Sequence, residues 1–513
     1  MLFARGDRPR IGRARVRNGE SYCMNASKGV GHKAVSGTAY LGVAQIIKIV
    51  VSILSVIVTA RLLDPAQYGV AAMVAPITGF ILIFQNLGLN QAVVQSKTIT
   101  EAQTNALFWV NIAASAIVSL VFLITSPLVG LFYGDIRPGQ VMAASAATVL
   151  ITGLSLQHTA LLNRNMKFKQ IAVVDIVNAV TTLGATAISA YLLRSYWAIW
   201  IGAFCAAIVN GVMVWAYSPW RPTLKPSFAG IRSLVTFGAN VTGFNLLNYI
   251  ARNVDNVLIA KIWGAGPVGL YDRSYKLMMF PLTNINAPLA RVMLPLLARL
   301  RDEPERYRNA FLLSVRALMI FSVPGVIAAA STSDRLVPFL LGERWAAAAP
   351  IFFWLSLAAI TQPLSNATGW LFMSSGSSSR MLKWGLFSSI TTVISFVIGV
   401  RWGPVGVAMA YLIGQLLRTP ILYSICTKGT SVRQVDLYGL TIVPILAGAP
   451  TFLLVKLVEP RLETLPLLIF AVAVSYTLNI SAQLTSTNGR QALNRIRELL
   501  VSAVGSKLLK KSM

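Results

Sequence analysis

The sequence predicts an all-α, polytopic membrane protein with about fourteen transmembrane helices. Of its 513 residues, 55% are hydrophobic and only 12% are charged, which is about half the charged fraction of a soluble protein. The apolar residues also form long blocks: residues 41–60 contain one full charge, Lys48, and residues 437–455 and 467–480 contain none. A helix needs about 20 such residues to cross a bilayer, whereas barrel strands alternate in polarity over about 10 residues. The blocks therefore predict helices.

Hydropathy places the predicted spans along most of the chain. They lie near residues 38–60, 70–94, 106–125, 140–162, 171–193, 197–217, 234–262, 274–298, 309–331, 346–372, 382–400, 403–424, 437–457 and 464–484.

The net charge of +28 comes from 45 Lys and Arg residues against 17 Asp and Glu residues. Most of the basic residues lie in short loops, so they do not form the single basic surface of a nucleic-acid-binding domain. With the N-terminus in the cytoplasm, the inside segments hold roughly three times as many Lys and Arg residues as the outside segments. This bias predicts that both termini are cytoplasmic and that the number of spans is even.

The chain divides into five predicted parts. A basic cytoplasmic segment, residues 1–37, lacks the apolar core of a signal peptide, and translation is expected to begin at Met24. Helices 1–6 form an N-lobe over residues 38–220, and helices 7–12 form a C-lobe over residues 221–430. Helices 13 and 14 follow over residues 431–485, and a basic tail ends the chain.

An internal repeat supports the two lobes. A shift of 200 residues places residues 60–62 (Ala-Arg-Leu) on 260–262 (Ala-Lys-Ile), and Gly69 on Gly269. A shift of 208 places residues 128–135 on 336–343. The shift spans six helices, an even number, so it predicts parallel repeats around a central cavity, with alternating access by rocking of the lobes. The alternative is chance similarity among apolar segments.

Charged side chains inside the membrane are costly, and they mark candidate functional sites. Lys48 lies well inside the first span, and Asn248, Arg252 and Asp255 form one polar stripe on the seventh, at helical spacing. An Arg suits a bidentate contact to phosphate. Lys48, Asn248 and Arg252 are therefore predicted to bind substrate in a cationic cavity. The alternative is that Arg252 and Asp255 only neutralise each other.

The eighth span adds three basic candidates, Arg273, Lys276 and Arg291. Asp272 precedes Lys276 in the favourable acid-first i,i+4 order. Arg273 and Lys276 are predicted substrate contacts; the alternative is a solvated helix end. Asp255, or Asp175 in the fifth span, is a candidate site for a coupling proton or sodium ion.

Helix-breaking residues in two spans are hinge candidates. Pro281 and Pro288 lie seven residues apart in the eighth span, and Pro76 and Gly79 lie in the second. Proline frees a backbone carbonyl and permits bending.

Three stretches resemble a known family. They are ARLLDPAQYGVAAMVAPITGFILIFQNLGLNQAVVQ (residues 60–95), GLYDRSYKLMMFPLTNINAPLARVMLPLLARL (269–300) and RWGPVGVAMAYLI (401–413). They are similar to the polysaccharide transporter branch of the multidrug/oligosaccharidyl-lipid/polysaccharide flippase superfamily, and the resemblance covers most of residues 37–429. It implies two six-helix lobes around a cationic cavity and two extra helices.

The same resemblance implies a substrate and a mechanism. The substrate would be an oligosaccharide repeat unit joined through pyrophosphate to a polyprenyl lipid. It would be flipped across the bacterial inner membrane for exopolysaccharide or lipopolysaccharide biosynthesis, alongside polymerase and export machinery. An H⁺ or Na⁺ gradient would drive the movement, with no cofactor, no metal and no enzymatic step. The sequence has no phosphate-binding GxxxxGK[ST] loop.

Three alternatives remain. A drug/cation antiporter of the superfamily would favour acidic cavity residues, whereas the candidates here are mostly basic. A peptidoglycan lipid-precursor flippase would share fourteen helices and a cationic cavity. A membrane-bound polysaccharide polymerase would lack the repeat and would carry a large periplasmic loop.

Overall fold

A computed structural model of the chain describes residues 42–86, 93, 99–224, 249, 253–486, 489–495 and 498. The side chains of Pro281, Arg291 and residues 284–288 are not part of this description, although their backbone lies in a described helix. Over the described ranges the secondary structure is helical and contains no strand. The predicted all-α fold is confirmed.

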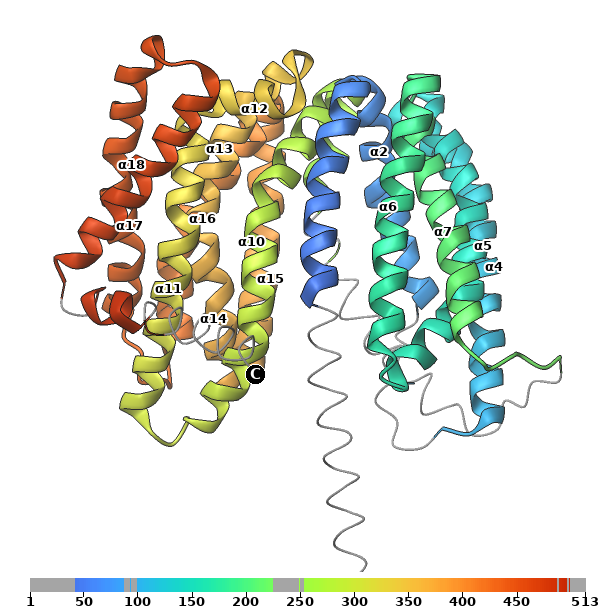
Figure 1. Cartoon of the computed structure of the whole chain (residues 1–513), viewed down its shortest axis with the longest axis horizontal. Coiled ribbons are helices and arrows are strands. Elements are labelled where there is room, and N and C mark those ends of the chain that lie inside the picture. Colours follow the sequence, from blue (N-terminus) through green and yellow to red (C-terminus); the bar gives the residue numbers. More distant parts are fainter. Residues whose placement is uncertain are drawn as a thin grey trace, which may run out of the picture.

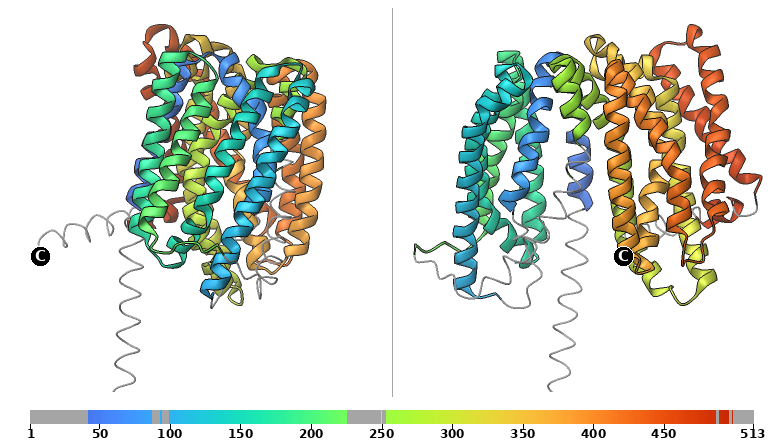
Figure 2. Two further views of the ribbon diagram at one scale, coloured as in Figure 1. Left: turned by 90° about the vertical axis from the view of Figure 1, so that its right-hand side faces the viewer. Right: turned by 180° about the vertical axis from the view of Figure 1, so that it is seen from behind.

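The helices form two lobes that stand side by side (Figures 1 and 2). The N-lobe consists of the first helix (Gly42–Leu62), α2 (Pro65–Asn86), α4 (Glu101–Tyr133), α5 (Ile136–Arg164), α6 (Phe168–Leu193) and α7 (Trp197–Tyr217). The C-lobe consists of α9 (Val254–Trp263), α10 (Ala265–Arg299), α11 (Pro304–Ser331), α12 (Ser333–Leu341), α13 (Ala349–Ala359), α14 (Gln362–Ser374), α15 (Ser378–Gly399) and α16 (Gly403–Cys426). Short 3-10 turns, Glu343–Ala348, Val400–Trp402 and Glu459–Arg461, link some of the helices.

Two further helices, α17 (Gln434–Val458) and α18 (Thr464–Leu484), cover the outer side of the C-lobe (Figure 1). Ser475 and Tyr476 of α18 donate hydrogen bonds to backbone carbonyls of α11, at 2.9 and 2.7 Å. The guanidinium of Arg308, on α11, forms an ion pair with Asp436 in the first turn of α17. The two helices therefore pack against the C-lobe as part of the bundle.

Apolar length explains why these segments cross a membrane. Eleven helical segments within the described ranges are long and apolar enough to span a bilayer, and one of them, Ser378–Cys426, contains both α15 and α16. The helix α10, which carries the predicted eighth span, is not among the eleven. A described helix coincides with each predicted span except the seventh. Only the last part of the seventh span lies in a described helix, α9. The molecule is a multi-pass membrane protein.

The contact between the lobes has the two-fold relation that the repeat predicts. A Cβ atom added to Gly69 on α2 would lie 1.7 Å from the carbonyl oxygen of Ala265, and one added to Gly269 on α10 would lie 2.1 Å from that of Pro65. Pro65 and Ala265 are also related by the shift of 200. Gly69 therefore packs on Ala265 and Gly269 packs on Pro65, so the repeat relates the two contacts. Only glycine permits so close an approach.

The second repeat match lies where two helices end. The helix α4 stops at Gly134 and α12 stops at Gly342, and both glycines have a positive φ, of 69° and 96°. The match differs in one respect, since α4 runs unbroken through 33 residues whereas its C-lobe counterpart divides into α11 and α12 at Thr332.

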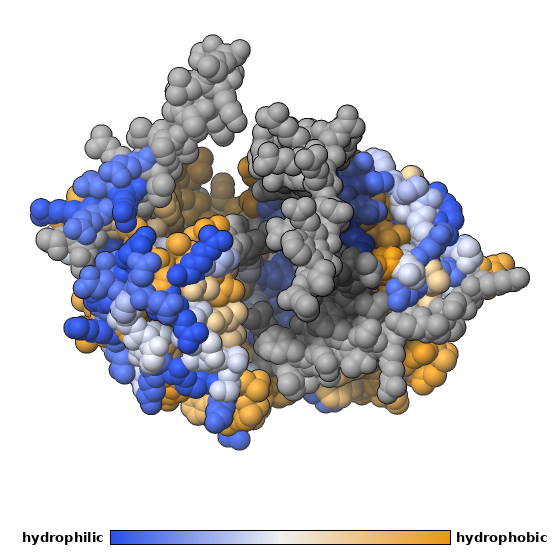
Figure 3. Space-filling view, turned by 90° about the horizontal axis from the view of Figure 1, so that it is seen from below, coloured by the Kyte–Doolittle hydropathy of each residue, from blue (hydrophilic) through white to orange (hydrophobic). Residues whose placement is uncertain are grey.

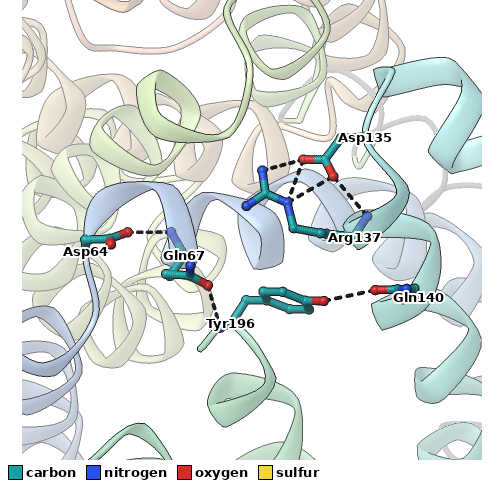
Figure 4. Close-up of polar contacts among 6 residues, drawn as sticks. All are labelled: Asp64, Gln67, Asp135, Arg137, Gln140 and Tyr196. Atoms are coloured by element: carbon teal, nitrogen blue, oxygen red, sulfur yellow. Dashed lines mark hydrogen bonds and ion pairs between the residues drawn. The ribbon is translucent and has the colours of Figure 1, made fainter. Parts of the chain in front are cut away.

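A polar network fixes the N-lobe near the lobe contact (Figure 4). Gln67 of α2 accepts a hydrogen bond from the backbone N–H of Tyr196, whose hydroxyl donates to Gln140 of α5, both at 2.9 Å. Beside it, hydrogen bonds from Arg137 hold the pKa of the Asp135 carboxyl below its usual value. The network joins α2, α5 and the segment before α7, so these parts can move as one body.

Candidate functional site

The lobes meet at one end of the bundle, where α2 and α10 begin; this is called the closed end below (Figure 1). Arg61 of the N-lobe donates a hydrogen bond to the carbonyl of Phe339 in the last turn of α12, at 2.9 Å. Lys261, its repeat partner in the C-lobe, donates to the carbonyl of Phe132 in the last turn of α4. Helix C-termini carry partial negative charge that favours a cation. The two contacts form a reciprocal clamp between the lobes.

An aromatic contact reinforces the closed end. The indole nitrogen of Trp345 donates to the carbonyl of Ala60 at 2.7 Å, and its ring meets the ring of Tyr68 edge to face. Trp345 is fully buried. A side chain of the C-lobe therefore lies inside the packed surface between the lobes.

A charged cluster spans the same interface. Lys276 of α10 lies 2.7 Å from Asp272, which confirms the predicted acid-first pair, and its ammonium donates to the hydroxyl of Tyr68 on α2 at 3.1 Å. Asp272 also accepts from Tyr68, at 2.9 Å, and from the side chain of Asn256, at 3.2 Å. The carboxylate is 5% exposed, whereas the Lys276 side chain is 50% exposed. Lys276 can therefore meet a ligand without leaving its counter-ion.

Arg273 has the opposite character. It is only 6% exposed, its guanidinium lies 3.9 Å from the ring centre of Tyr68, and it donates to the hydroxyl of Thr59 on the first helix at 2.7 Å. In this conformation the Arg273 guanidinium stabilises the contact between the lobes. Its assignment to substrate, like that of Lys276, stays a prediction.

At the end opposite the closed end, a recess lies between the two lobes (Figure 3). Lys48 of the first helix lies about 21 Å along that helix from its last residue. Its ammonium forms a 2.9 Å ion pair with Asp175 on α6, and the two side chains are 38% and 41% exposed. Charged groups within a membrane span avoid lipid and face a polar interior. A half-exposed ion pair at this depth of a span is therefore a candidate site for an anionic group.

A polar stripe runs along the first helix between these two regions. Gln45, Lys48, Ser52, Ser55 and Thr59 recur at spacings of three and four residues, so they share one face of the helix. The face changes from exposed at Gln45 and Ser52 to buried at Thr59, under the charged cluster. The stripe joins the Lys48 pair to the closed end.

The remaining predicted polar residues fall into two groups. Asp255 is 4% exposed and accepts hydrogen bonds from the hydroxyl of Tyr271 and the backbone N–H of Asn256, both at 2.9 Å. It is thus enclosed by protein in this conformation. Asn248 and Arg252 lie outside the described residues, as does the side chain of Arg291.

The predicted hinge in the second span has one observed contact. The hydroxyl of Tyr249 donates to the carbonyl of Ala75 at 3.0 Å, and a Cβ on Gly79 would lie 2.0 Å from that hydroxyl. Gly79 therefore admits a close contact from the C-lobe beside the buried Pro76. Pro281 and Pro288 lie within α10. Bending at any of these positions remains a prediction.

Sequence reasoning missed three parts of the site. It named Lys48 and Asp175 as separate candidates, because a contact across 127 residues leaves no local pattern. It did not assign Tyr68, the residue shared by the charged cluster. It aligned Arg61 with Lys261 as repeat partners but gave neither residue a role. The signal that could have found them is a basic residue at the same position of both repeats, beside the boundary between the lobes.

The architecture defines the class of protein, a polytopic helical membrane protein with two pseudo-symmetric lobes. The structure resembles the lipid II flippase MurJ in an inward closed conformation, with a TM-score of 0.68 at 12% identity, covering 87% of this chain and 98% of MurJ. It also resembles an inward-facing multidrug resistance MATE family transporter, with a TM-score of 0.59 at 13% identity, covering 79% and 98% of the two chains.

The family follows from the sequence. The model of the polysaccharide biosynthesis protein family matches residues 58–350, and the chain belongs to this family. It is 25% identical to the lipopolysaccharide biosynthesis protein WzxC of Escherichia coli (strain K12), over 78% of this chain and 83% of WzxC. It is 26% identical to the teichuronic acid biosynthesis protein TuaB of Bacillus subtilis (strain 168), over 63% and 72% of the two chains. The predicted resemblance is confirmed.

Proposed function

We propose that this protein flips polyprenyl-pyrophosphate-linked oligosaccharide repeat units across the bacterial inner membrane, for exopolysaccharide or lipopolysaccharide biosynthesis. The observation that carries the proposal is a pair of half-exposed lysines, Lys48 and Lys276, inside the spans of a two-lobed member of the polysaccharide biosynthesis protein family. Lysine ammonium groups bind phosphate as point charges. The names of the relatives WzxC and TuaB support a substrate from polysaccharide assembly.

The arrangement supports alternating access. In this proposal the closed end lies at the periplasmic face and the recess at the cytoplasmic face, which is the orientation that the loop charges predict. The pyrophosphate would enter from the cytoplasm, bind Lys48, and follow the polar stripe towards Lys276. Separation of the clamp formed by Arg61 and Lys261 would then open the periplasmic side.

Movement of the substrate makes and breaks no covalent bond, so the proposed activity is transport and not catalysis. The energy would come from an H⁺ or Na⁺ gradient, with Asp175 or Asp255 as the coupling site. A polysaccharide polymerase and export machinery would act on the delivered repeat units.

A deletion strain tests this function. Lipid-linked repeat units should accumulate, and they should resist a membrane-impermeant glycosidase or periodate label applied to spheroplasts, because they remain in the cytoplasmic leaflet. Plasmid-borne wild-type protein should restore labelling. Labelled repeat units in the deletion strain, at the wild-type level, would contradict the proposal.

A further inference from the structure

The ion pair between Lys48 and Asp175 carries an inference that rests on the proposed function. Lys48 on the first helix is the cation nearest the open end of the polar stripe, and it already holds a carboxylate at 2.9 Å. A phosphate that reaches Lys48 must compete with that carboxylate. Both side chains are about 40% exposed, so a ligand can reach the pair.

We propose that Asp175 is an internal competitor for the anionic group of the substrate. In the empty state Asp175 neutralises Lys48. When a prenyl diphosphate binds, one of its phosphate oxygens replaces the carboxylate at the Lys48 ammonium, and Asp175 takes up one proton from water at the open end. No other bond forms or breaks, and the charge on Lys48 is unchanged.

The surroundings of Asp175 favour this exchange. In the described helices, no second cation faces the carboxylate. The helix α7, which packs on α6, carries no charged residue, and α6 itself carries only Lys169, in its first turn. On α5, Arg164 donates to the carbonyl of Val93 instead. A carboxylate displaced from Lys48 by a phosphate is therefore left beside a second anion within a membrane span, and uptake of a proton removes that repulsion.

The exchange has two consequences. The empty transporter avoids a bare ammonium group in its cavity, which would hold any passing anion. Binding of an anionic lipid also becomes coupled to uptake of a proton at the same place, and this proton is released together with the lipid on the other side. The pair thus sets selectivity against weak anions and lowers by one the negative charge that crosses with each lipid, whereas the driving gradient acts elsewhere, with Asp255 as the remaining candidate.

The test uses the purified full-length chain in detergent and farnesyl diphosphate as the probe. Calorimetric titration gives the affinity, and titration in two buffers of different ionisation enthalpy gives the number of protons taken up. Wild-type protein should take up about one proton per bound probe. The variant Asp175→Asn should bind roughly five- to tenfold more tightly and take up none, because a partly exposed ion pair no longer has to break.

Four further variants keep the test decisive. Lys48→Ala should weaken binding, and adding Asp175→Asn to it should give no gain, since the competitor acts only through Lys48. Lys48→Arg should retain both binding and proton uptake. Asp135→Asn, the same change in the ion pair with Arg137 at the start of α5, should leave affinity and proton uptake at the wild-type level.

The outcomes separate the two proposals. If Asp175→Asn binds no more tightly than wild type, or still takes up a proton, the exchange is wrong while the proposed function stands. If wild-type protein does not bind farnesyl diphosphate at all, the proposed class of substrate is wrong.

Discussion

Two neighbouring basic residues on α10 differ in what they can reach. Arg273 is buried against Tyr68 and Thr59, whereas Lys276 keeps half of its side chain exposed beside Asp272. Sequence position alone made them equivalent candidates. The structure separates them. Arg273 lies within the contact between the lobes, whereas Lys276, three residues later on the helix, stays partly exposed beside that contact.

Substitution should separate their roles. Lys276→Ala should reduce affinity for farnesyl diphosphate about fivefold and should also lower Tm, since it leaves the 5% exposed carboxylate of Asp272 without its counter-ion. Arg273→Ala should lower stability by about 2 kcal/mol, since it removes a buried hydrogen bond and a cation–π contact. Calorimetry and thermal unfolding of the purified variants measure both. A stable Arg273→Ala with strongly reduced affinity would reverse the assignment.

At the scale of helices, the crossing of α2 and α10 depends on two glycines. A single methyl group on Gly69 would lie 1.7 Å from the Ala265 carbonyl, so the two helices would have to separate. Their N-termini would move apart, and the clamp contacts of Arg61 and Lys261 would lengthen with them. Glycine at this position is therefore a requirement of the closed end.

The variant Gly69→Ala should shift the protein away from the conformation described here. A cysteine introduced at Thr59, which is 4% exposed, should react with a small maleimide several-fold faster in the Gly69→Ala background. Gly184→Ala on α6 is the matched control, because a Cβ there meets nothing within 4 Å. Equal labelling rates in the Gly69→Ala and Gly184→Ala backgrounds would show that the glycine crossing does not hold the lobes together.

The added helices α17 and α18 depend on a different contact. The guanidinium of Arg308 approaches both carboxylate oxygens of Asp436, which is 15% exposed at the start of α17. Arg308→Ala should lower Tm by about 2 °C, since it removes a two-point, charge-assisted contact. Arg306→Ala breaks an ion pair with Glu303 in which the Arg306 side chain is 71% exposed, so it should leave Tm unchanged. Equal effects of the two substitutions would show that the contact does not anchor α17.

At the scale of the whole molecule, hydropathy and loop charge predict the helices because the bilayer imposes their length. The repeat predicts the two lobes, since it aligns Gly69 with Gly269 and Arg61 with Lys261. What the sequence does not contain is the meeting of residues from different helices. The contacts of Lys48 with Asp175 and of Tyr68 with Asp272 join residues more than a hundred positions apart, and no periodicity records such pairs.

The central claim is that the lobes must separate at the closed end for the substrate to cross. Arg61→Cys with Phe339→Cys places one thiol in each lobe at the clamp, and a short bismaleimide with a cleavable disulfide spacer can join them. The measurement is movement of a fluorescent polyprenyl-diphosphate oligosaccharide between leaflets of proteoliposomes that contain this variant. Bridged protein should still bind the lipid but should not move it, and reduction of the spacer should restore the rate. Movement at the unbridged rate while the bridge is intact would contradict the account.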